Sequence, residues 1–264
     1  MSNPSSAQEP VLAFHHGRLY EIRLNRAHRL NGFTDALATS VIHHIKKAED
    51  DPNVRVLLMT ATGPTFSCGM DLDDLLHDGY EAVQISKLLD TIYNPLIRKL
   101  ASVRLPVVAA LNGIAAGGAV GLVLAADFIV ASKDAKLVSA FSKLGLVPDC
   151  GVSWAAVRKL GYNRAMAFSL LERTIDANEG MRLGVFTEVV GTSDLHSSAI
   201  ELSEKLAATS AMATSLTKAA FNDALSAPLE TQLETERGLQ DSAFSGSDFM
   251  EGFRAFKEKR RPQF

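Results

Sequence analysis

The chain has few of the residues that build disulfide frameworks or metal centres. Its 264 residues include two cysteines, Cys68 and Cys150, which lie far apart in the sequence. Two thiols cannot form a multi-bridge framework, and no CxxC or Cys/His pair stands at metal-ligand spacing. The sequence therefore predicts two reduced thiols packed as small apolar groups, a cytoplasmic setting and no metal site.

The features of secreted, membrane and nucleic-acid-binding proteins are also missing. The longest apolar stretch, residues 107–126, is interrupted by Asn112 and four glycines, so it is not a continuous membrane span. Residues 1–10 lack the basic and apolar regions of a signal peptide and are predicted to be a disordered lead. The net charge of −3, without basic patches interleaved with aromatics, argues against nucleic acid as a partner.

Two well-known catalytic signatures are absent. No G-x-G-x-x-G stands between a strand and a helix, which argues against a nicotinamide cofactor. No G-x-S-x-G is present, so the nucleophile turn of an α/β-hydrolase has no counterpart. The sequence predicts no separate cofactor.

What the chain does contain is an alternation of strand and helix patterns followed by helices alone. Strands are expected near residues 19–25, 54–60 and 107–111, and helices near 35–47, 85–100 and from Gly117 or Gly118 onward. After residue 194 only helical patterns remain, at 197–209, 215–224, 229–243 and 248–259. We therefore expect an α/β core at residues 11–192 and an α-helical module at 193–264.

Two glycine-bearing loops are the candidates for chemistry. Residues 65–72 read Thr-Phe-Ser-Cys-Gly-Met-Asp-Leu, and residues 112–119 read Asn-Gly-Ile-Ala-Ala-Gly-Gly-Ala between a strand and a helix. Glycine allows close approach of a ligand, and a helix start leaves N–H groups without intrahelical partners. Two such groups converging on one oxygen would form an oxyanion hole, worth about 2.7–4 kcal/mol per donor. Each loop by itself is equally compatible with a simple tight turn.

Four segments in a fixed order carry a family resemblance. Leu24-Asn-Arg26 with Leu30-Asn31 comes first, and segments 66–72, 112–118 and 145–151 follow. The ordered set resembles the crotonase, or enoyl-CoA hydratase/isomerase, superfamily over nearly the whole chain. Within it, segments 93–100, 140–151 and 259–264 are most similar to ring-1,2-epoxyphenylacetyl-CoA isomerases. The resemblance implies a spiral of ββα turns, a helical trimerisation region and an acyl-CoA thioester substrate, with coenzyme A as part of that substrate. It also implies a homotrimer or a dimer of trimers.

The resemblance assigns binding roles to individual residues. It implies that the oxyanion donors are the backbone N–H groups of Met70 and Gly118. Coenzyme A is expected to meet Arg26 and Arg29 at its phosphates. The adenine is expected to lie against Phe66, Ser67 and Cys68, bonded to their backbone. Lys259 is expected to reach the phosphates of coenzyme A bound at a neighbouring subunit. The alternative for the basic run 257–261 is a solvated charged end.

The side chains beside the hole decide the reaction. Hydratases of the superfamily carry two glutamates, and the matching positions here are Gly121 and Phe141. Asp149 stands where the isomerases have their acidic base, which moves a proton from C2 to C4. The alternative for Asp149 is a turn residue that hydrogen-bonds locally. A binding protein without catalytic activity and an atypical hydratase are the alternatives to an isomerase.

The acyl pocket is expected to include Gly121, Phe141, Leu144 and Asn94. Asn94 and Phe141 replace the histidine and tryptophan of the similar 4-chlorobenzoyl-CoA dehalogenases, which argues against dehalogenation. An apolar surrounding of Phe141, Leu144 and Val147 is expected to raise the pKa of Asp149 by desolvation. Segment 77–92 is expected to add a pocket wall, and Trp154 to pack in the core.

Overall fold

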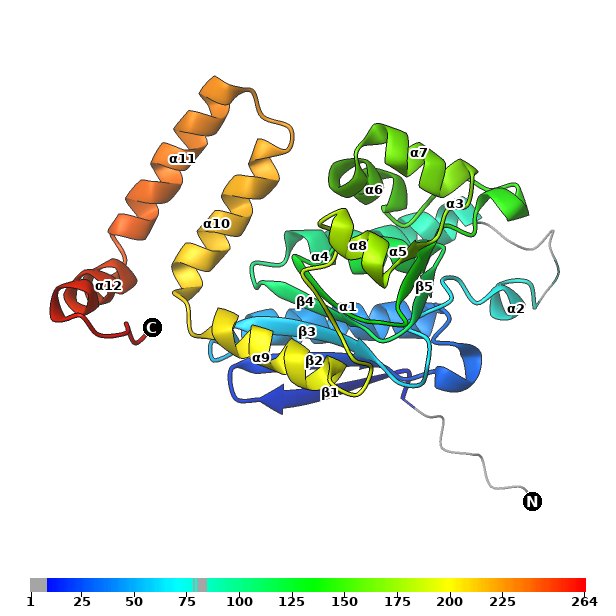
Figure 1. Cartoon of the computed structure of the whole chain (residues 1–264), viewed down its shortest axis with the longest axis horizontal. Coiled ribbons are helices and arrows are strands. Elements are labelled where there is room, and N and C mark those ends of the chain that lie inside the picture. The colour runs from blue at the N-terminus through cyan, green and yellow to red at the C-terminus, as the bar shows by residue number, and fades with distance from the viewer. Residues whose placement is uncertain (1–8, 78, 80–84) are drawn as a thin grey trace, which may run out of the picture.

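The computed structural model describes residues 9–77, 79 and 85–264. The predicted disordered lead and part of the predicted pocket wall at 77–92 lie outside the described residues. A six-stranded sheet, in the order β1-β2-β3-β4-β6-β9, forms the centre of the molecule (Figure 1). Its strands are β1 Val11–His16, β2 Leu19–Leu24, β3 Val56–Ala61, β4 Val107–Leu111, β6 Phe128–Ser132 and β9 Glu188–Val190. A second, three-stranded sheet has the order β5-β7-β8 and contains β5 Ile114–Ala116, β7 Lys136–Val138 and β8 Ile175–Asp176.

The strand pairing follows from the connections. β1 and β2 are joined by a short turn and pair antiparallel, whereas β2, β3, β4, β6 and β9 pair parallel through longer crossovers. The crossover helices are α1 Asp35–Asp50, α2 Leu72–Leu75, α3 Ile85–Leu88, α4 Asn94–Ser102, α5 Gly118–Leu124, α6 Val152–Leu160, α7 Tyr162–Leu170 and α8 Ala177–Arg182. The strand β1 was missed by the sequence analysis, which placed the first strand at residue 19. The expected α/β fold class, a ββα spiral followed by helices, is confirmed.

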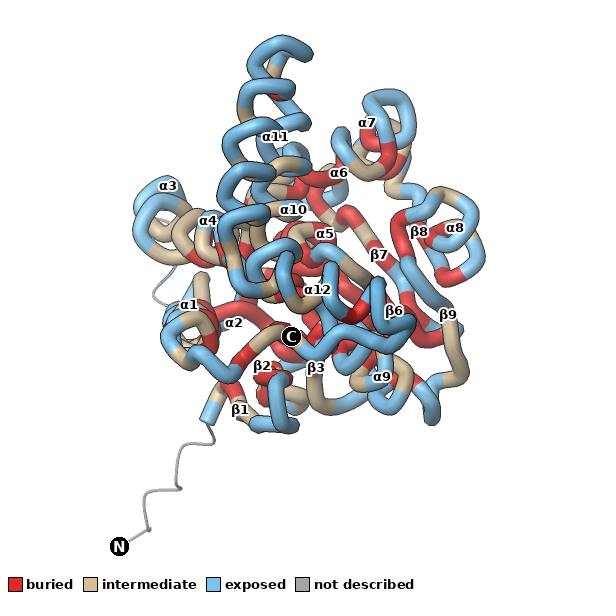
Figure 2. The backbone as a smooth tube through the Cα atoms, turned by 90° about the vertical axis from the view of Figure 1, so that its left-hand side faces the viewer, coloured by how far each residue is buried: buried red, intermediate tan, exposed pale blue. Residues whose placement is uncertain are grey.

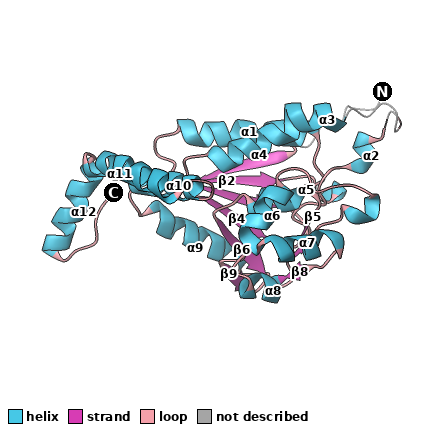
Figure 3. Cartoon of the chain, turned by 90° about the horizontal axis from the view of Figure 1, so that it is seen from above, coloured by secondary structure: helices cyan, strands magenta, loops and turns pink. Residues whose placement is uncertain are grey.

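Both faces of the large sheet are covered, and the strand residues alternate accordingly. Leu57 and Met59 of β3 join the main core with buried residues of α1 and α4, while Val56 and Leu58 join a second cluster with α9 Leu195–Ala207. Figure 3 shows α1 and α4 on one side of the strands and α9 on the other. The predicted boundary at residue 192 therefore separates α9 from the sheet on which it packs.

The last three helices stand away from the core. They are α10 Ala211–Ala224, α11 Leu229–Phe244 and α12 Ser247–Glu258, which agrees closely with the expected ranges. They extend from one end of the molecule, and most of their surface is exposed (Figures 1 and 2). In the described part of the chain, no helix combines the length and apolar character that crossing a bilayer requires.

Glu21 on β2 ties β1, β3 and α9 together. Its carboxylate is fully buried and accepts hydrogen bonds from Thr60 Oγ1 at 2.6 Å and Arg23 Nε at 2.8 Å. The Nε2 atoms of His16 and His196 lie 3.0 and 3.1 Å from Glu21 Oε2. Burial by itself raises the pKa of Glu21, but these hydrogen bonds outweigh burial and hold the pKa at about 2. The carboxylate is therefore ionised in the folded protein over the whole physiological range.

Replacing Glu21 with glutamine is expected to lower the free energy of unfolding by about 1.5–3 kcal/mol, the usual worth of hydrogen bonds to a charged group. Because the folded pKa is lowered, this stabilisation is present above the unfolded value and is lost as the pH falls toward 2. Urea denaturation at several pH values measures both effects. Glu236→Gln, at an exposed position of α11, is the control. Equal stability of the two variants at pH 7 would contradict the assignment.

Candidate active site

The two glycine-bearing loops lie side by side along β5. An isolated bridge pairs Ser67 with Ala115, and the Ala116 N–H donates to the Ser67 carbonyl at 3.0 Å. A Cβ added at Gly69 would lie 2.7 Å from the Ala116 carbonyl oxygen and 3.3 Å from the Gly118 nitrogen. Only glycine allows this approach. Met70 is the next residue, so it lies where the first loop touches the start of α5.

The amide of Met70 differs from its neighbours. The Gly69 N–H donates to Ser67 Oγ at 3.1 Å, and the Asp71 N–H donates to the Phe33 carbonyl at 3.0 Å. Within the described ranges, the Met70 N–H between them has no acceptor. Its two neighbours fix the orientation of the backbone and leave this one donor for a ligand.

The amide of Gly118 is in the same situation. Gly117 has φ 53° and ψ −130°, a conformation that needs glycine, and its N–H donates to the Val138 carbonyl at 3.0 Å. Gly118 is buried at the first position of α5, and no acceptor for its N–H occurs among the described residues. A buried donor without a partner is uncommon and indicates a ligand site. The two N–H groups named from the resemblance are thus unpaired and belong to adjoining loops.

The turn that carries Asp149 rests on the glycine face of α5. A Cβ added at Gly118 would lie 2.9 Å from Cys150 Sγ and 3.6 Å from Asp149 Oδ1. A Cβ added at Gly121, one helical turn on, would lie only 2.0 Å from the Cys150 carbonyl oxygen. The aspartate carboxylate therefore lies beside the start of α5, and the place of a hydratase glutamate at 121 is filled by backbone.

Asp149 is partly buried, and burial raises its pKa above the ordinary value, as expected. A hydrogen bond with the Cys150 side chain acts in the opposite direction. The expected source of burial is only partly right: Phe141 is buried, but Leu144 and Val147 are 57% and 78% exposed in this chain. Their roles in an acyl pocket stay predictions.

Local backbone geometry holds the turn in place. Cys150 has a left-handed φ of 47°, which is strained for a residue with a side chain, and the Val152 N–H donates to the Asp149 carbonyl at 2.8 Å. Asp149 is thus a turn residue, and its carboxylate also lies beside the candidate hole. The two interpretations of the sequence are compatible.

Tyr93 is a buried residue near Asp149 that was not named as a candidate site residue from the sequence. It ends a π-helical segment, Leu89–Tyr93, just before Asn94 and Pro95, and proline has no N–H to continue the α-helical ladder. Tyr93 is buried; burial raises its pKa, and nearby acidic groups, Asp149 among them, add to the shift. The segment 93–100 carried the resemblance, but only half-buried Asn94 was named from it.

The residues expected at the adenine differ in their access to a ligand. Phe66 and Ser67 have no exposed surface, and Ser67 Oγ donates to the Asn31 carbonyl at 2.7 Å. Cys68 is only partly buried. The loop packing encloses Phe66 and Ser67 in the single chain, and their contact with coenzyme A stays a prediction. Of the three residues, Cys68 has the best access to a bound adenine.

The expected phosphate-binding arginines are engaged with a carboxylate. Arg26 Nη1 lies 3.1 Å from Asp71 Oδ2, and Arg29 Nη2 lies 2.9 Å from Asp71 Oδ1. Arg29 is the more exposed of the two side chains, at 39% against 18%. Arg29 therefore has the better access to a bound phosphate.

Lys259 lies far from both loops within one chain. It ends α12, at the opposite end of the molecule from α2 and α5 (Figures 1 and 3). Its neighbour Arg260 is paired with Glu251 and Glu258, each at 2.6 Å. A contact between Lys259 and coenzyme A bound at these loops would require a second chain.

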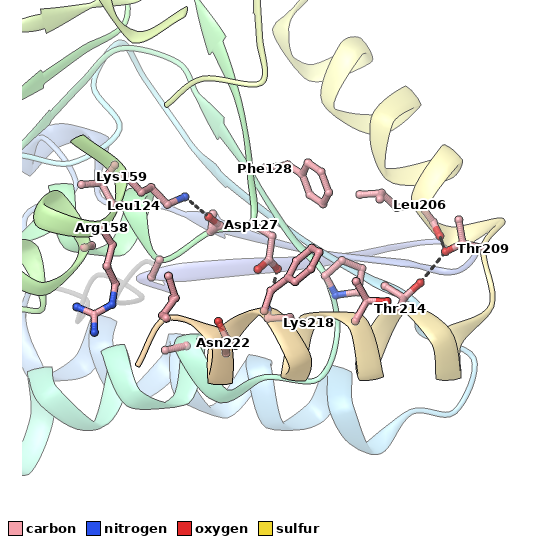
Figure 4. A pocket seen from close by; sticks show the side chains of 18 of the residues that line it. Leu124, Asp127, Phe128, Arg158, Lys159, Leu206, Thr209, Thr214, Lys218 and Asn222 are labelled. Carbon is pink, nitrogen blue, oxygen red and sulfur yellow. Dashed lines mark hydrogen bonds and ion pairs between the residues drawn. The ribbon is translucent and has the colours of Figure 1, made fainter. Parts of the chain in front are cut away.

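A large hollow of the described surface lies away from the two loops. It measures about 650 Å³ and is bordered by the C-terminal end of α5, by α6 and by α10 (Figure 4). Its charged groups are largely satisfied internally: Lys218 pairs with Asp127 at 2.7 Å, and Lys159 donates to the Ala126 carbonyl at 2.8 Å. Trp154 borders this groove and is 46% exposed, so its predicted place in the core is wrong.

Comparisons with known proteins agree with the geometry. Residues 15–264 match the family model described as enoyl-CoA hydratase/isomerase. The chain is 39% identical to 1,2-epoxyphenylacetyl-CoA isomerase of Escherichia coli K12, over 92% of this chain and 93% of the relative. It is 35% identical to a Rhodobacter capsulatus protein named probable enoyl-CoA hydratase, with the same coverage.

Solved structures of enoyl-CoA hydratases are similar to this chain over nearly its whole length. An enoyl-CoA hydratase from Polaromonas sp. JS666 superposes with a TM-score of 0.91 at 30% identity, covering 96% of this chain and 98% of that one. An enoyl-CoA hydratase from Bacillus anthracis reaches a TM-score of 0.89 at 28% identity, covering 97% and 98%. The chain belongs to the enoyl-CoA hydratase/isomerase family and is an enzyme of that family.

Proposed function

We propose that the protein is an acyl-CoA isomerase in which Asp149 is the only base and the N–H groups of Met70 and Gly118 bind the thioester oxygen. The observation that carries the proposal is the contact geometry of the Asp149 turn with α5. The Asp149 carboxylate lies beside Gly118, and the Cys150 backbone occupies the space next to Gly121, where a second carboxylate would begin.

One carboxylate is sufficient for a shift of a double bond from C3 to C2. Asp149 takes a proton from C2, and the electron pair moves through the carbonyl to the thioester oxygen. The two N–H groups stabilise the resulting dienolate, each by about 2.7–4 kcal/mol. The protonated Asp149 then returns the proton at C4, and the electron pair on the oxygen re-forms the thioester carbonyl. No cofactor beyond the coenzyme A part of the substrate takes part.

Incubation with a 3-enoyl-CoA tests the proposal. We expect the 2-enoyl-CoA product, followed by its conjugated absorbance, without incorporation of solvent oxygen. The identity with a relative named 1,2-epoxyphenylacetyl-CoA isomerase supports an isomerase. Coenzyme A thioester binding without turnover of any enoyl-CoA would reject it in favour of a binding protein.

Hydration of a 2-enoyl-CoA is the second candidate, because several relatives are named enoyl-CoA hydratases. The residues at the two glutamate positions, Gly121 and Phe141, argue against it. Reaction in ¹⁸O-labelled water distinguishes the two activities, since only hydration transfers solvent oxygen to the product.

We also propose that α10–α12 assemble the chain into a homotrimer or a dimer of trimers. Large apolar side chains along these helices are exposed in the single chain, with Phe221 at 70%, Phe244 at 61% and Phe256 at 81%. Exposed large apolar side chains on neighbouring helices are typical of a protein interface. Assembly would also bring Lys259 of one chain toward the loops of another.

Phe256→Glu is expected to shift the assembly to smaller species in analytical ultracentrifugation, because a carboxylate would replace an apolar contact. Asn53→Glu makes the same change of charge at an exposed turn after α1 and should leave the assembly unchanged. A wild-type protein that sediments as a monomer at micromolar concentration would contradict this proposal.

A further inference from the structure

We propose that Asp71 is a positioning residue that couples the coenzyme-binding loop, residues 26–32, to the Met70 amide of the oxyanion hole. The inference rests on the proposed function of that hole. It goes beyond it by naming a residue that touches neither the reacting atoms nor the acyl group and that nevertheless sets the rate.

Asp71 is a buried carboxylate with two cationic partners. The residue is 6% exposed. Arg26 Nη1 binds Oδ2 at 3.1 Å, Arg29 Nη2 binds Oδ1 at 2.9 Å, and the Asp74 N–H donates to Oδ1 at 3.3 Å. A buried carboxylate is stable only with such partners, so the two arginines and Asp71 form one unit. These bonds outweigh the effect of burial and lower the pKa of Asp71.

The same unit fixes the backbone on both sides of Met70. The Phe33 N–H donates to the Gly69 carbonyl at 2.6 Å, and the Asp71 N–H donates to the Phe33 carbonyl at 3.0 Å. Phe33 follows Gly32, whose carbonyl accepts from Arg26 Nη1 at 2.5 Å. The orientation of the Met70 amide therefore depends on the contact between Asp71 and the arginine loop.

The two arginines differ in exposure and in their partners. Arg26 is 18% exposed and is used by Asp71 and the Gly32 carbonyl. Arg29 is 39% exposed and also binds Asp73, which is 83% exposed. A guanidinium has five N–H donors, so Arg29 can exchange Asp73 for a phosphate while it keeps its bonds to Asp71. Coenzyme binding at Arg29 would thereby hold the Met70 amide more rigidly in place.

Asp71→Asn tests the inference because it keeps the shape of the side chain and removes its charge. We expect kcat for isomerisation to fall at least tenfold, since an oxyanion donor is no longer held in place. Coenzyme A itself should bind no more weakly than to the wild type, because the loop loses a negative charge. A role in folding alone would weaken binding and turnover together.

Infrared difference spectra of bound 2-butenoyl-CoA, ¹³C-labelled at the thioester carbonyl, report the hydrogen bonding of the thioester oxygen in the oxyanion hole. The wild type should lower the carbonyl frequency, and Asp71→Asn should lose most of that shift. Asp50→Asn, the same change of charge at the exposed end of α1, is the control and should keep both the shift and kcat. If Asp71→Asn fails to fold, Arg26→Lys, which keeps the charge but loses the guanidinium that contacts both Asp71 and the Gly32 carbonyl, takes its place and should show the same loss.

The outcomes separate this inference from the function on which it rests. A wild type that leaves the carbonyl frequency unchanged would reject the oxyanion hole itself. A normal wild-type shift that is retained in Asp71→Asn, or in Arg26→Lys where that variant is used, together with unchanged kcat, would overturn the role of Asp71.

Discussion

Asp149→Asn is expected to lower kcat for isomerisation by about 10²–10⁴-fold, the usual contribution of a positioned general base. The amide cannot take the C2 proton, while its similar size keeps the contacts with Cys150 and α5. Substrate binding should change little, because the Met70 and Gly118 amides and the coenzyme loop are untouched. Single-turnover measurements with a 3-enoyl-CoA separate the two effects.

The pH profile provides a second readout of Asp149. Burial raises its pKa above the ordinary value of about 3.9. Only the ionised carboxylate accepts a proton, so kcat should fall as the pH decreases through this raised pKa. The acidic limb should therefore lie at higher pH than for an exposed aspartate, and it should vanish from the residual activity of the Asn variant.

Asp50→Asn, at the exposed end of α1, is the control and should retain full activity with an unchanged pH profile. Activity of Asp149→Asn within a few-fold of the wild type would contradict the assignment of the base. In that case the carboxylate would serve only the turn, in which the Val152 N–H donates to the Asp149 carbonyl.

The sequence was sufficient where the signal is local. The alternation at residues 19–25 and 54–60 and the spacing of apolar residues at 35–47 gave β2, β3 and α1 to within a few residues. Thr34 and Asp176 cap their helices as their residue types predict. Strands of two or three residues, such as β5 and β8, contain too few positions for an alternation to be recognised, and they were missed.

Tertiary contacts explain the other differences. Nothing local in the sequence shows that Ser67 is enclosed, that Trp154 is exposed or that Asp71 binds both arginines, because each depends on segments brought together by the fold. Gly121 was assigned to the acyl pocket from the resemblance. The structure also packs it against the Cys150 carbonyl, a contact that becomes visible only when the turn is placed on α5.

That contact leads to the second large expected effect. Gly121→Glu restores a residue type that the hydratases carry, yet it should not produce a hydratase. Its Cβ alone would lie 2.0 Å from the Cys150 carbonyl oxygen and 3.0 Å from the carbonyl carbon. Backbone cannot yield as a flexible side chain would, so the Asp149 turn must move.

Displacement of Asp149 by about 1 Å is expected to cost about 10²-fold in isomerisation, because proton transfer needs near-contact geometry. Gly121→Ala should show the same loss, since the clash begins at Cβ and not at the carboxylate. Gly238→Ala, in α11, has no neighbour within 4 Å of the added atom and should leave the rate unchanged. Rates with a 3-enoyl-CoA, and product analysis in ¹⁸O-labelled water, provide the measurements.

Solvent oxygen in the product of Gly121→Glu would show that the turn can withdraw and that one substitution separates the two chemistries. Wild-type isomerisation in Gly121→Ala would show that the close packing of Cys150 on α5 is not required. The expected loss in both variants would instead mean that the Asp149 turn excludes the glutamate physically. The choice of one carboxylate over two would then lie in the backbone path of residues 149–151 as much as in the side chains present.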